Sequence, residues 1–473
     1  MKTAAGVGVL LGGLVTGDWL GSVAVAVLFA AWWLVRIADG PPVLAAALTF
    51  HWIQVSIGLF YASITGRTLS AITSSDYRTM VLIGLGCVLA LAAGLHLGMR
   101  ATPSRSETAP PIHAPIFGLN TLIVIYIGLV ATAGGVQQLA WQFPIFTQAI
   151  LAVSYLRLGL VYVLMRRLSV PSPDVLRIAV LLTVEVGLGL TGFFASFREP
   201  LILAAIALSE VFDSKRASHW ATASGVVAGI VLVGLFWSGV RAEYRQDFYD
   251  VEAFAETRSM RLERINVLAS DWVRSDAQEM LWNVDFLVDR LWAIYYPALA
   301  VARVPSVLPH TEGSIIGGAL RHIVTPRVFF PDKPVLPSDS EMVRTYSGVF
   351  VAGAEQDTSI AFGYAAEAYV DFGVPLMFLP VLLWGVFLGF AYQTVLRLIR
   401  HRELAIPVVT VIFWMSVFLF ERSWIKWMGS TGTLLIYLGG MTYAIDWWLR
   451  QREAADAALP QATGPLTPPI GQR

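Results

Sequence analysis

Apolar segments of helical length alternate with short polar turns along most of this chain. A helix needs about 17–25 largely apolar residues to cross a bilayer, and most of the segments reach that length. The pattern therefore predicts about twelve membrane-spanning helices, at 4–16, 19–35, 42–62, 80–97, 117–133, 144–165, 175–195, 200–211, 220–237, 374–396, 405–420 and 431–449.

Two of these segments are too short to cross without help. The segment 4–16 follows Lys2 and can be interpreted as the hydrophobic region of a signal peptide. We favour a short first span that turns at Gly17 and Asp18 and returns as the second. The segment 200–211 needs a thinned bilayer, burial among neighbouring helices or a re-entrant path.

One long stretch, 241–373, is too polar to lie in a membrane and separates nine predicted spans from three. Within it, 251–273 and 277–304 have helical spacing with mixed faces, and the second is rich in aromatic residues. Such a helix lies in the membrane interface or packs on the helical bundle. The sequence thus divides into N-terminal membrane helices (1–240), a large loop (241–373), C-terminal membrane helices (374–449) and a disordered tail (450–473).

Composition agrees with an all-α, polytopic membrane protein. The chain is 56% hydrophobic and 14% charged, whereas soluble domains carry about 25% charged residues. The net charge of zero gives no indication of a nucleic-acid partner. Because Cys87 is the single cysteine, an intrachain disulfide and a cysteine metal cluster are excluded. Motifs for ATP binding, serine hydrolysis or zinc peptidase chemistry do not occur in a fitting context.

The loop charges predict which side each loop faces. Cytoplasmic loops are enriched in Lys and Arg, and a cytoplasmic N-terminus gives one consistent pattern. The large loop then faces outward, although it holds about a dozen Lys and Arg. The residues that set this orientation are Arg36, Arg100, Arg105, Arg166, Arg167, Lys215, Arg216, Arg397, Arg400, Arg402, Arg450 and Arg452 on the inner side.

Basic residues near the outer ends of the spans are candidates for binding an anion. Guanidinium groups bind diphosphate through paired hydrogen bonds. The alternative is that each side chain reaches to lipid headgroups or pairs with a neighbouring carboxylate, such as Glu199, Glu243, Asp247 or Glu421. The candidates are Arg198, Arg241, Arg245, Arg321, His322, Arg327, Lys333, Arg422 and Lys426.

Carboxylates at the mouth of the tenth span are candidates for a general base. Glu367 and Asp371 are four residues apart and share one helical face, and we favour Glu367 as the base. The alternative is that they complement a helix dipole. His322 is a second acid–base candidate, although we favour a structural role for this histidine. Inside the bilayer, Arg157 and Glu185 fall at similar depth and are predicted to pair.

Two outward segments resemble a known family. The run Thr325-Pro-Arg-Val-Phe-Phe-Pro-Asp-Lys-Pro334 and the run Thr358–Gly373, which reads Thr-Ser-Ile-Ala-Phe-Gly-Tyr-Ala-Ala-Glu-Ala-Tyr-Val-Asp-Phe-Gly, are similar to segments of the Wzy-type O-antigen (oligosaccharide repeat unit) polymerases. A short outward turn with Arg198 adds to the likeness, although Phe-Arg-Glu-Pro departs from the family's small-residue-Arg-Gly. The resemblance is closest over 321–389 and elsewhere is architectural.

The resemblance implies a bacterial inner-membrane glycosyltransferase of the GT-C type with a periplasmic active site. Its substrates would be oligosaccharides on undecaprenyl diphosphate, in a lipid bilayer, without a metal or other cofactor; a chain-length regulator is a further expected partner. The family's arginines would map onto Arg198, Arg241, Arg245, Arg327 and Arg422, and Trp424 and Tyr369 are candidates for stacking on sugars. An O-antigen ligase, or a flippase or other transporter, remains an alternative.

Overall fold

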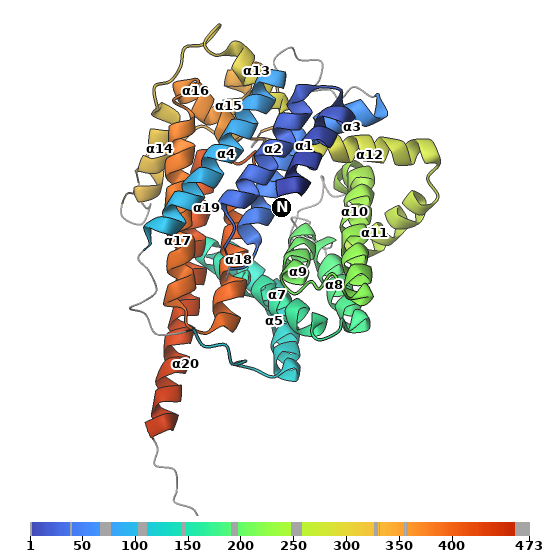
Figure 1. Cartoon of the computed structure of the whole chain (residues 1–473), viewed down its shortest axis with the longest axis vertical. Coiled ribbons are helices and arrows are strands. Elements are labelled where there is room, and N and C mark those ends of the chain that lie inside the picture. Colours follow the sequence, from blue (N-terminus) through green and yellow to red (C-terminus); the bar gives the residue numbers. More distant parts are fainter. Residues whose placement is uncertain are drawn as a thin grey trace, which may run out of the picture.

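The computed structural model describes residues 2–37, 40–66, 77–102, 111–143, 147–190, 197–246, 258–325, 330, 332–353, 355 and 358–458. Every regular element in these ranges is a helix (Figure 1). An isolated parallel bridge between Ile112 and His401 is the one β-type pairing described there. The all-α prediction is therefore confirmed.

The N-terminal half follows the predicted apolar segments closely. α1 (Lys2–Thr16) turns at Gly17, whose φ of +61° suits glycine, and Asp18 caps α2 (Trp19–Leu34) by accepting a hydrogen bond from the Leu20 amide. The predicted hairpin is thus confirmed. The following helices are α3 (Val43–Thr65), α4 (Tyr77–Ala101), α5 (Leu119–Gln142), α6 (Thr147–Ser154), α7 (Leu156–Ser169), α8 (Val175–Leu190), α9 (Arg198–Glu210) and α10 (Ala217–Gln246).

The large loop folds into short helices instead of two long ones. The predicted helix 277–304 is broken at Trp292, where the indole NH donates to the Val55 carbonyl oxygen of α3 (2.9 Å). The hydrophobic pattern alone does not reveal this long-range contact. The helices are α11 (Arg258–Val273), α12 (Ala277–Leu291), α13 (Tyr295–Arg303), α14 (Ser314–Val324), α15 (Asp339–Ser347) and α16 (Tyr364–Phe372).

The C-terminal part contains α17 (Phe378–Leu398) and α18 (Arg402–Val417). A continuous helical run then begins earlier than predicted, with α19 (Trp424–Thr433), the π-helical segment η4 (Leu434–Gly439) and α20 (Gly440–Ala458). The start of the predicted tail, 450–458, belongs to α20, and its remainder lies outside the described residues.

Within the described residues, five helices are long and apolar enough to cross a membrane, so the topology of about twelve spans stays a prediction. They are Val43–Thr65, Tyr77–Ala101, Thr147–Ser169, Ala217–Tyr244 and Phe378–Leu398. The short helix α9 buries Leu201, Leu203 and Ile206 among its neighbours, so it follows the burial alternative. Arg157 and Glu185 form the predicted pair at 2.8 Å, and the Tyr126 hydroxyl donates to the same carboxylate at 2.8 Å.

α4 and α17 pack with their backbones in close approach. Gly94 and Gly98 face Gly385 and Gly389, and both pairs have the four-residue spacing that lets backbones approach. A Cβ atom built on Gly98 would lie 2.0 Å from the Val386 carbonyl oxygen. The glycines therefore determine how closely these helices pack.

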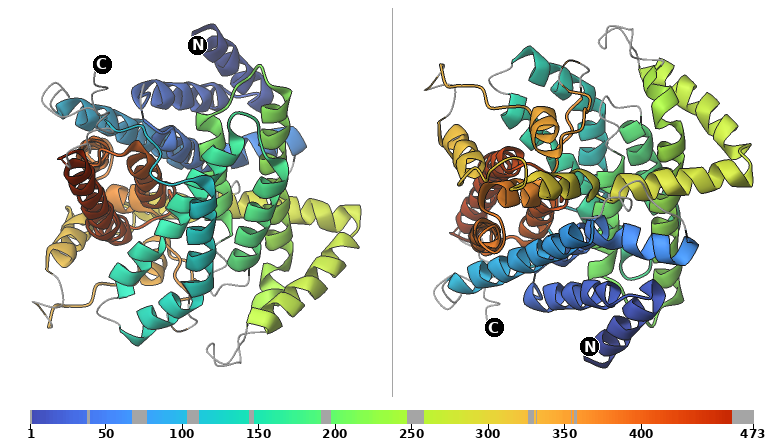
Figure 2. Two further views of the ribbon diagram at one scale, coloured as in Figure 1. Left: turned by 90° about the horizontal axis from the view of Figure 1, so that it is seen from below. Right: turned by 90° about the horizontal axis from the view of Figure 1, so that it is seen from above.

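Short helices of the stretch 241–373 and the C-terminal helix lie at opposite ends of the molecule (Figure 1). α13 to α16 lie at one end and α20 at the other (Figure 1). Figure 2 shows α12 reaching from the centre of the molecule to its edge, where α11 turns back. Arg78, in the first turn of α4, pairs with Asp18, which caps α2.

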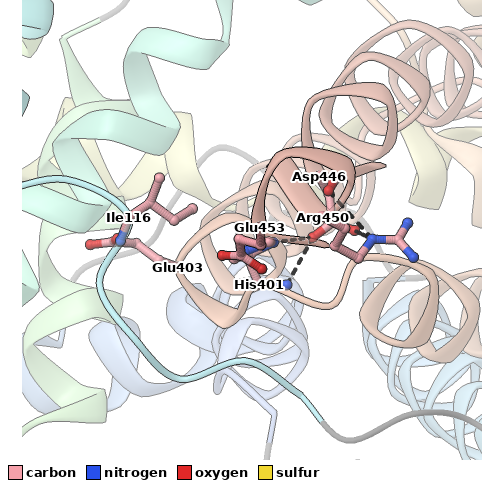
Figure 3. A network of polar contacts seen from close by, with 6 residues as sticks. All are labelled: Ile116, His401, Glu403, Asp446, Arg450 and Glu453. Atoms are coloured by element: carbon pink, nitrogen blue, oxygen red, sulfur yellow. Dashed lines mark hydrogen bonds and ion pairs between the residues drawn. The ribbon is translucent and has the colours of Figure 1, made fainter. Parts of the chain in front are cut away.

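At the predicted inner end, Glu403 accepts hydrogen bonds from the Ile116 amide and the Arg167 guanidinium, both at 2.6 Å. Beside it, the imidazole of His401 contacts carboxylate oxygens of Asp446 (2.7 Å) and Glu453 (3.1 Å), which joins the start of α18 to α20 (Figure 3). Loops distant in sequence are thus held together on this side.

Candidate functional site

Four arginines from different parts of the chain lie near one carboxylate, and we call these five residues the arginine cluster. Arg198 begins α9, Arg241 lies in α10 and Arg290 lies in the last turn of α12. Glu421 and Arg422 lie between α18 and α19. The charges of Arg290, Arg198 and Arg241 all act on the Glu421 carboxylate, and the charge of Arg198 acts on Arg422. The fold thus brings together three arginines that the sequence singled out.

Glu421 is half-buried and has no direct partner in the described part of the chain. Its carboxylate neither accepts a hydrogen bond nor forms an ion pair there. Burial raises the pKa of Glu421, and the positive charges of Arg290, Arg198 and Arg241 oppose that rise. Its proton affinity is therefore sensitive to any anion that enters among the arginines.

Arg422 is fixed in place by the end of α18. Its Nη1 donates to the carbonyl oxygens of Met415 (2.6 Å) and Ser416 (3.3 Å) and to Ser430 Oγ (3.2 Å). These contacts satisfy carbonyl groups that a helix end leaves without an intrahelical donor. Burial lowers the pKa of Arg422 to about 10, so the guanidinium remains charged at neutral pH. It contributes a fixed positive charge.

Arg198 and Arg290 are the accessible members of the cluster. Arg198 is half-exposed; its Nε donates to Glu199 Oε1 at 2.9 Å, and its guanidinium lies 5.2 Å from the ring centroid of Phe418. Arg290 is exposed and has no ion pair with any of the residues described. Because guanidinium groups bind phosphate oxygens in pairs, these two side chains can hold an anionic ligand beside Glu421.

Gln54 of α3 positions the two segments that carry Arg290 and Glu421. Its backbone carbonyl accepts from the Ala293 amide (2.9 Å), three residues after Arg290. Its side-chain oxygen accepts from the Phe420 amide (2.6 Å), next to Glu421. Gly58 allows this approach, since a Cβ there would lie 2.3 Å from the Trp292 ring. A residue of the third predicted span therefore sets the geometry of the cluster.

The two carboxyl groups predicted as base candidates cap the starts of other helices, and their role as a base stays a prediction. Glu367 is 3% exposed and accepts from the Trp424 amide (2.7 Å) at the start of α19. Asp371 is buried and accepts from the amides of Ile315 (3.0 Å) and Ile316 (2.9 Å) at the start of α14. Each side chain therefore accepts hydrogen bonds from backbone amides at the N-terminus of a different helix, as a cap does.

This cap gives Glu367 a testable pH signature. Burial raises its pKa to about 8, so the folded state binds a proton that the unfolded state has released above about pH 4.5. The stabilisation is full below pH 4.5 and is lost as the pH rises toward 8. We expect Glu367→Gln to remain folded and to lose this decline in thermal stability.

Glu367→Ala, which leaves the Trp424 amide without an acceptor, should cost about 2 kcal/mol. Thermal unfolding of both variants in detergent between pH 5 and 9 measures the difference. A Glu367→Gln variant that unfolds normally but has lost at least a hundredfold in activity would return Glu367 to the role of general base.

The other predicted site residues lie in a separate group or are not described. Lys426 pairs with Asp339 (2.5 Å), and Lys333 Nζ donates to the carbonyl oxygens of His322 and Thr325 (both 2.9 Å), which caps the end of α14. Arg321 is exposed in the same last turn of α14. Arg327 and the side chain of Arg245 lie outside the described residues.

The aromatic candidates for sugar stacking are largely used in packing. Trp424 is fully buried, its indole NH donates to the Tyr364 carbonyl oxygen (3.0 Å), and Trp384 and Trp427 pack against it. Tyr369 is half-buried and donates to the Val304 carbonyl oxygen (3.0 Å). Both side chains are thus engaged in hydrogen bonds and ring contacts within the fold.

Sequence reasoning missed Arg290 and treated Glu421 only as an ion-pair partner of Arg422. Arg290 follows the aromatic face of α12 and carries no local motif. Glu421 does precede Arg422 directly in a predicted outer loop, which was the one available signal. Their approach depends on contacts with α3 that no local pattern encodes.

Comparison with known proteins identifies the family of the chain. The family defined by a domain of unknown function, DUF8712, matches residues 67–401, which include Arg198, Arg241 and Arg290. No curated protein and no solved structure matches the chain.

Proposed function

We propose that this protein is a glycosyltransferase that acts on oligosaccharides linked to a polyprenyl diphosphate. The chain belongs to the family defined by the domain of unknown function DUF8712. The growing glycan would pass from its lipid diphosphate to a lipid-linked repeat unit, as the resemblance to Wzy-type polymerases implies. The observation that supports it best is the convergence of Arg198, Arg241, Arg290 and Arg422 from four parts of the chain.

The chemistry of the reaction calls for such a cluster. The leaving group is a diphosphate, so negative charge grows on its oxygens as the bond to the anomeric carbon breaks. Donors fixed in a partly buried site stabilise that charge more in the transition state than in the ground state. Arg422, which is hydrogen-bonded to the end of α18, can supply a fixed positive charge. The accessible Arg198 and Arg290 can contact the diphosphate oxygens directly.

The proposal includes a membrane topology. About twelve spans with a cytoplasmic N-terminus would place the arginine cluster at the periplasmic side of a bacterial inner membrane. Five long apolar helices support a membrane location, and the grouping of predicted inner loops around Glu403 and His401 supports the two-sided arrangement. Charge concentrated in outward segments favours an enzyme over a transporter, whose site is typically at mid-depth between repeated halves.

The test uses purified full-length protein and lipid-linked repeat units extracted from source cells that lack this chain. We expect polymers of increasing length on a gel, with and without chelator. In a second arm, Arg274→Cys and Lys215→Cys are placed in a Cys87→Ala background and treated in intact cells with a membrane-impermeant maleimide. Both positions are exposed, and only Arg274→Cys should be labelled.

Each arm can reject a part of the proposal. A folded protein that forms no polymer under any condition, but moves the lipid-linked repeat unit across the membrane of reconstituted vesicles, would be a transporter. Transfer of finished polysaccharide to a lipid A core acceptor without chain growth would identify a ligase. Labelling of Lys215→Cys but not Arg274→Cys would place the arginine cluster on the cytoplasmic side and overturn the proposed substrate.

A further inference from the structure

Glu421 differs from the other carboxylates of the predicted outer segments by what surrounds it. Glu199 is bound by Arg198, Asp339 by Lys426 and Glu355 by Arg344. Glu367 and Asp371 cap helices. Glu421 alone in this comparison is flanked by several cations and bonded to none of the described residues.

Gln54 brings the segments of Glu421 and Arg290 together, because its two oxygens accept from the Phe420 amide (2.6 Å) and from the Ala293 amide (2.9 Å). Charged or titratable groups of four helices act on Glu421 there. Arg198 comes from α9, Arg241 from α10 and Arg290 from α12. Tyr296 comes from α13, and the charges of Glu421 and Arg290 both act on it. Arg422 follows in the same segment but directs its Nη1 toward the end of α18. The carboxylate is thus near the diphosphate-binding groups without being neutralised by a direct contact.

We propose that Glu421 is the proton acceptor of the transfer reaction and that Arg290 and Arg198 bind the departing diphosphate beside it. The inference rests on the proposed function. The acceptor sugar's hydroxyl oxygen bonds to the anomeric carbon of the donor. The bond between that carbon and the diphosphate oxygen breaks, its electron pair leaves with the diphosphate, and the hydroxyl proton passes to Glu421.

The electrostatics give a reason for this arrangement. In the absence of ligand, three arginines favour the ionised carboxylate, which is the form that accepts a proton. A bound diphosphate offsets their charge, so the proton affinity of Glu421 increases when the donor is present. Burial raises the pKa of Glu421 further toward the working pH, where a general base is most effective.

The test compares Glu421→Gln and Glu421→Asp with the wild-type chain. Loss of a general base typically lowers the rate about 10²- to 10⁴-fold, and we expect a kcat decrease in that range for Glu421→Gln. Binding of undecaprenyl diphosphate should be retained or tighter, because a negative charge has been removed. Wild-type kcat should fall as the pH decreases through the pKa of Glu421, and Glu421→Gln should lack that limb.

Glu421→Asp should recover part of the rate together with an acidic limb. Glu279→Gln provides the matched control, because Glu279 is exposed on α12 in the turn opposite the end that carries Arg290. That control should keep the wild-type rate and pH profile. Thermal unfolding verifies that each variant is folded, and if Glu421→Gln does not fold, the pH profile of Glu421→Asp decides.

Wild-type kcat in Glu421→Gln would overturn the inference, as would a parallel loss of rate and undecaprenyl diphosphate binding. An unchanged acidic limb in a slow Glu421→Gln variant would also overturn it, because another group would then carry the proton. Failure of the proposed function has a different signature. In that case the wild-type chain forms no polymer from any lipid-linked repeat unit, whatever the state of Glu421.

Discussion

Replacing Arg290 by alanine is expected to lower the rate of chain growth by about two orders of magnitude or more. Removal of one donor that stabilises a developing anion costs roughly 10²- to 10³-fold in comparable sites. Arg290 is exposed, its charge acts on the Glu421 carboxylate without a hydrogen bond or ion pair, and it has no ion pair within the described ranges, so its loss leaves no internal partner unpaired. The folded structure should survive the change.

The measurement is the initial rate of polymer formation with purified protein, together with binding of undecaprenyl diphosphate. Arg274→Ala is the matched control, since Arg274 is an exposed arginine between α11 and α12 with only a long contact to Asp271 (4.0 Å). Arg290→Lys should recover little, because an ammonium group cannot form the paired hydrogen bonds of a guanidinium. Equal rates for Arg290→Ala and Arg274→Ala would remove Arg290 from the site.

The second large effect is expected in the contact between α4 and α17. In Gly98→Ala, the new Cβ would lie 2.0 Å from the Val386 carbonyl oxygen, so the two helices must separate. Overpacking of this kind costs about 1–3 kcal/mol and sometimes more, and here the obstacle is backbone, which cannot change rotamer. We therefore expect about 3 kcal/mol of destabilisation and a clear loss of folded protein.

Gly128→Ala in α5 makes the same chemical change where no heavy atom lies within 4 Å of the new Cβ. That variant should be neutral or slightly stabilising, because alanine favours the helix over glycine by about 0.5–1 kcal/mol. Thermal unfolding followed by tryptophan fluorescence compares the two. If both variants melt together, the close approach of α4 and α17 does not limit stability.

The sequence predicted the helices better than their interruptions. Hydrophobic length located each apolar segment, and the expected pairing of Arg157 with Glu185 is present. The break after α12 was not predictable, because Trp292 leaves the helix to bond Val55, which is 237 residues away. Local spacing describes which residues share a face, and it carries no information about a partner so distant in the chain.

The same limit explains the outcome for the candidate site. Position at the ends of spans was enough to select Arg198, Arg241 and Arg422. The role expected for Glu367 depended on its being open to a substrate, whereas the Trp424 amide, 57 residues later, occupies its carboxylate. Arg290 and Glu421 gain their significance only from their approach to each other.

Gln54 has a consequence for how the parts of the chain depend on one another. Its carbonyl and side-chain oxygens hold the Ala293 and Phe420 amides at 2.9 and 2.6 Å, so one interior residue connects both halves of the cluster. A shift of α3 would alter the separation of Arg290 and Glu421 without touching either. Fragments beginning after 240 lack this anchor, and co-expressing them with 1–240 becomes a direct assay for assembly.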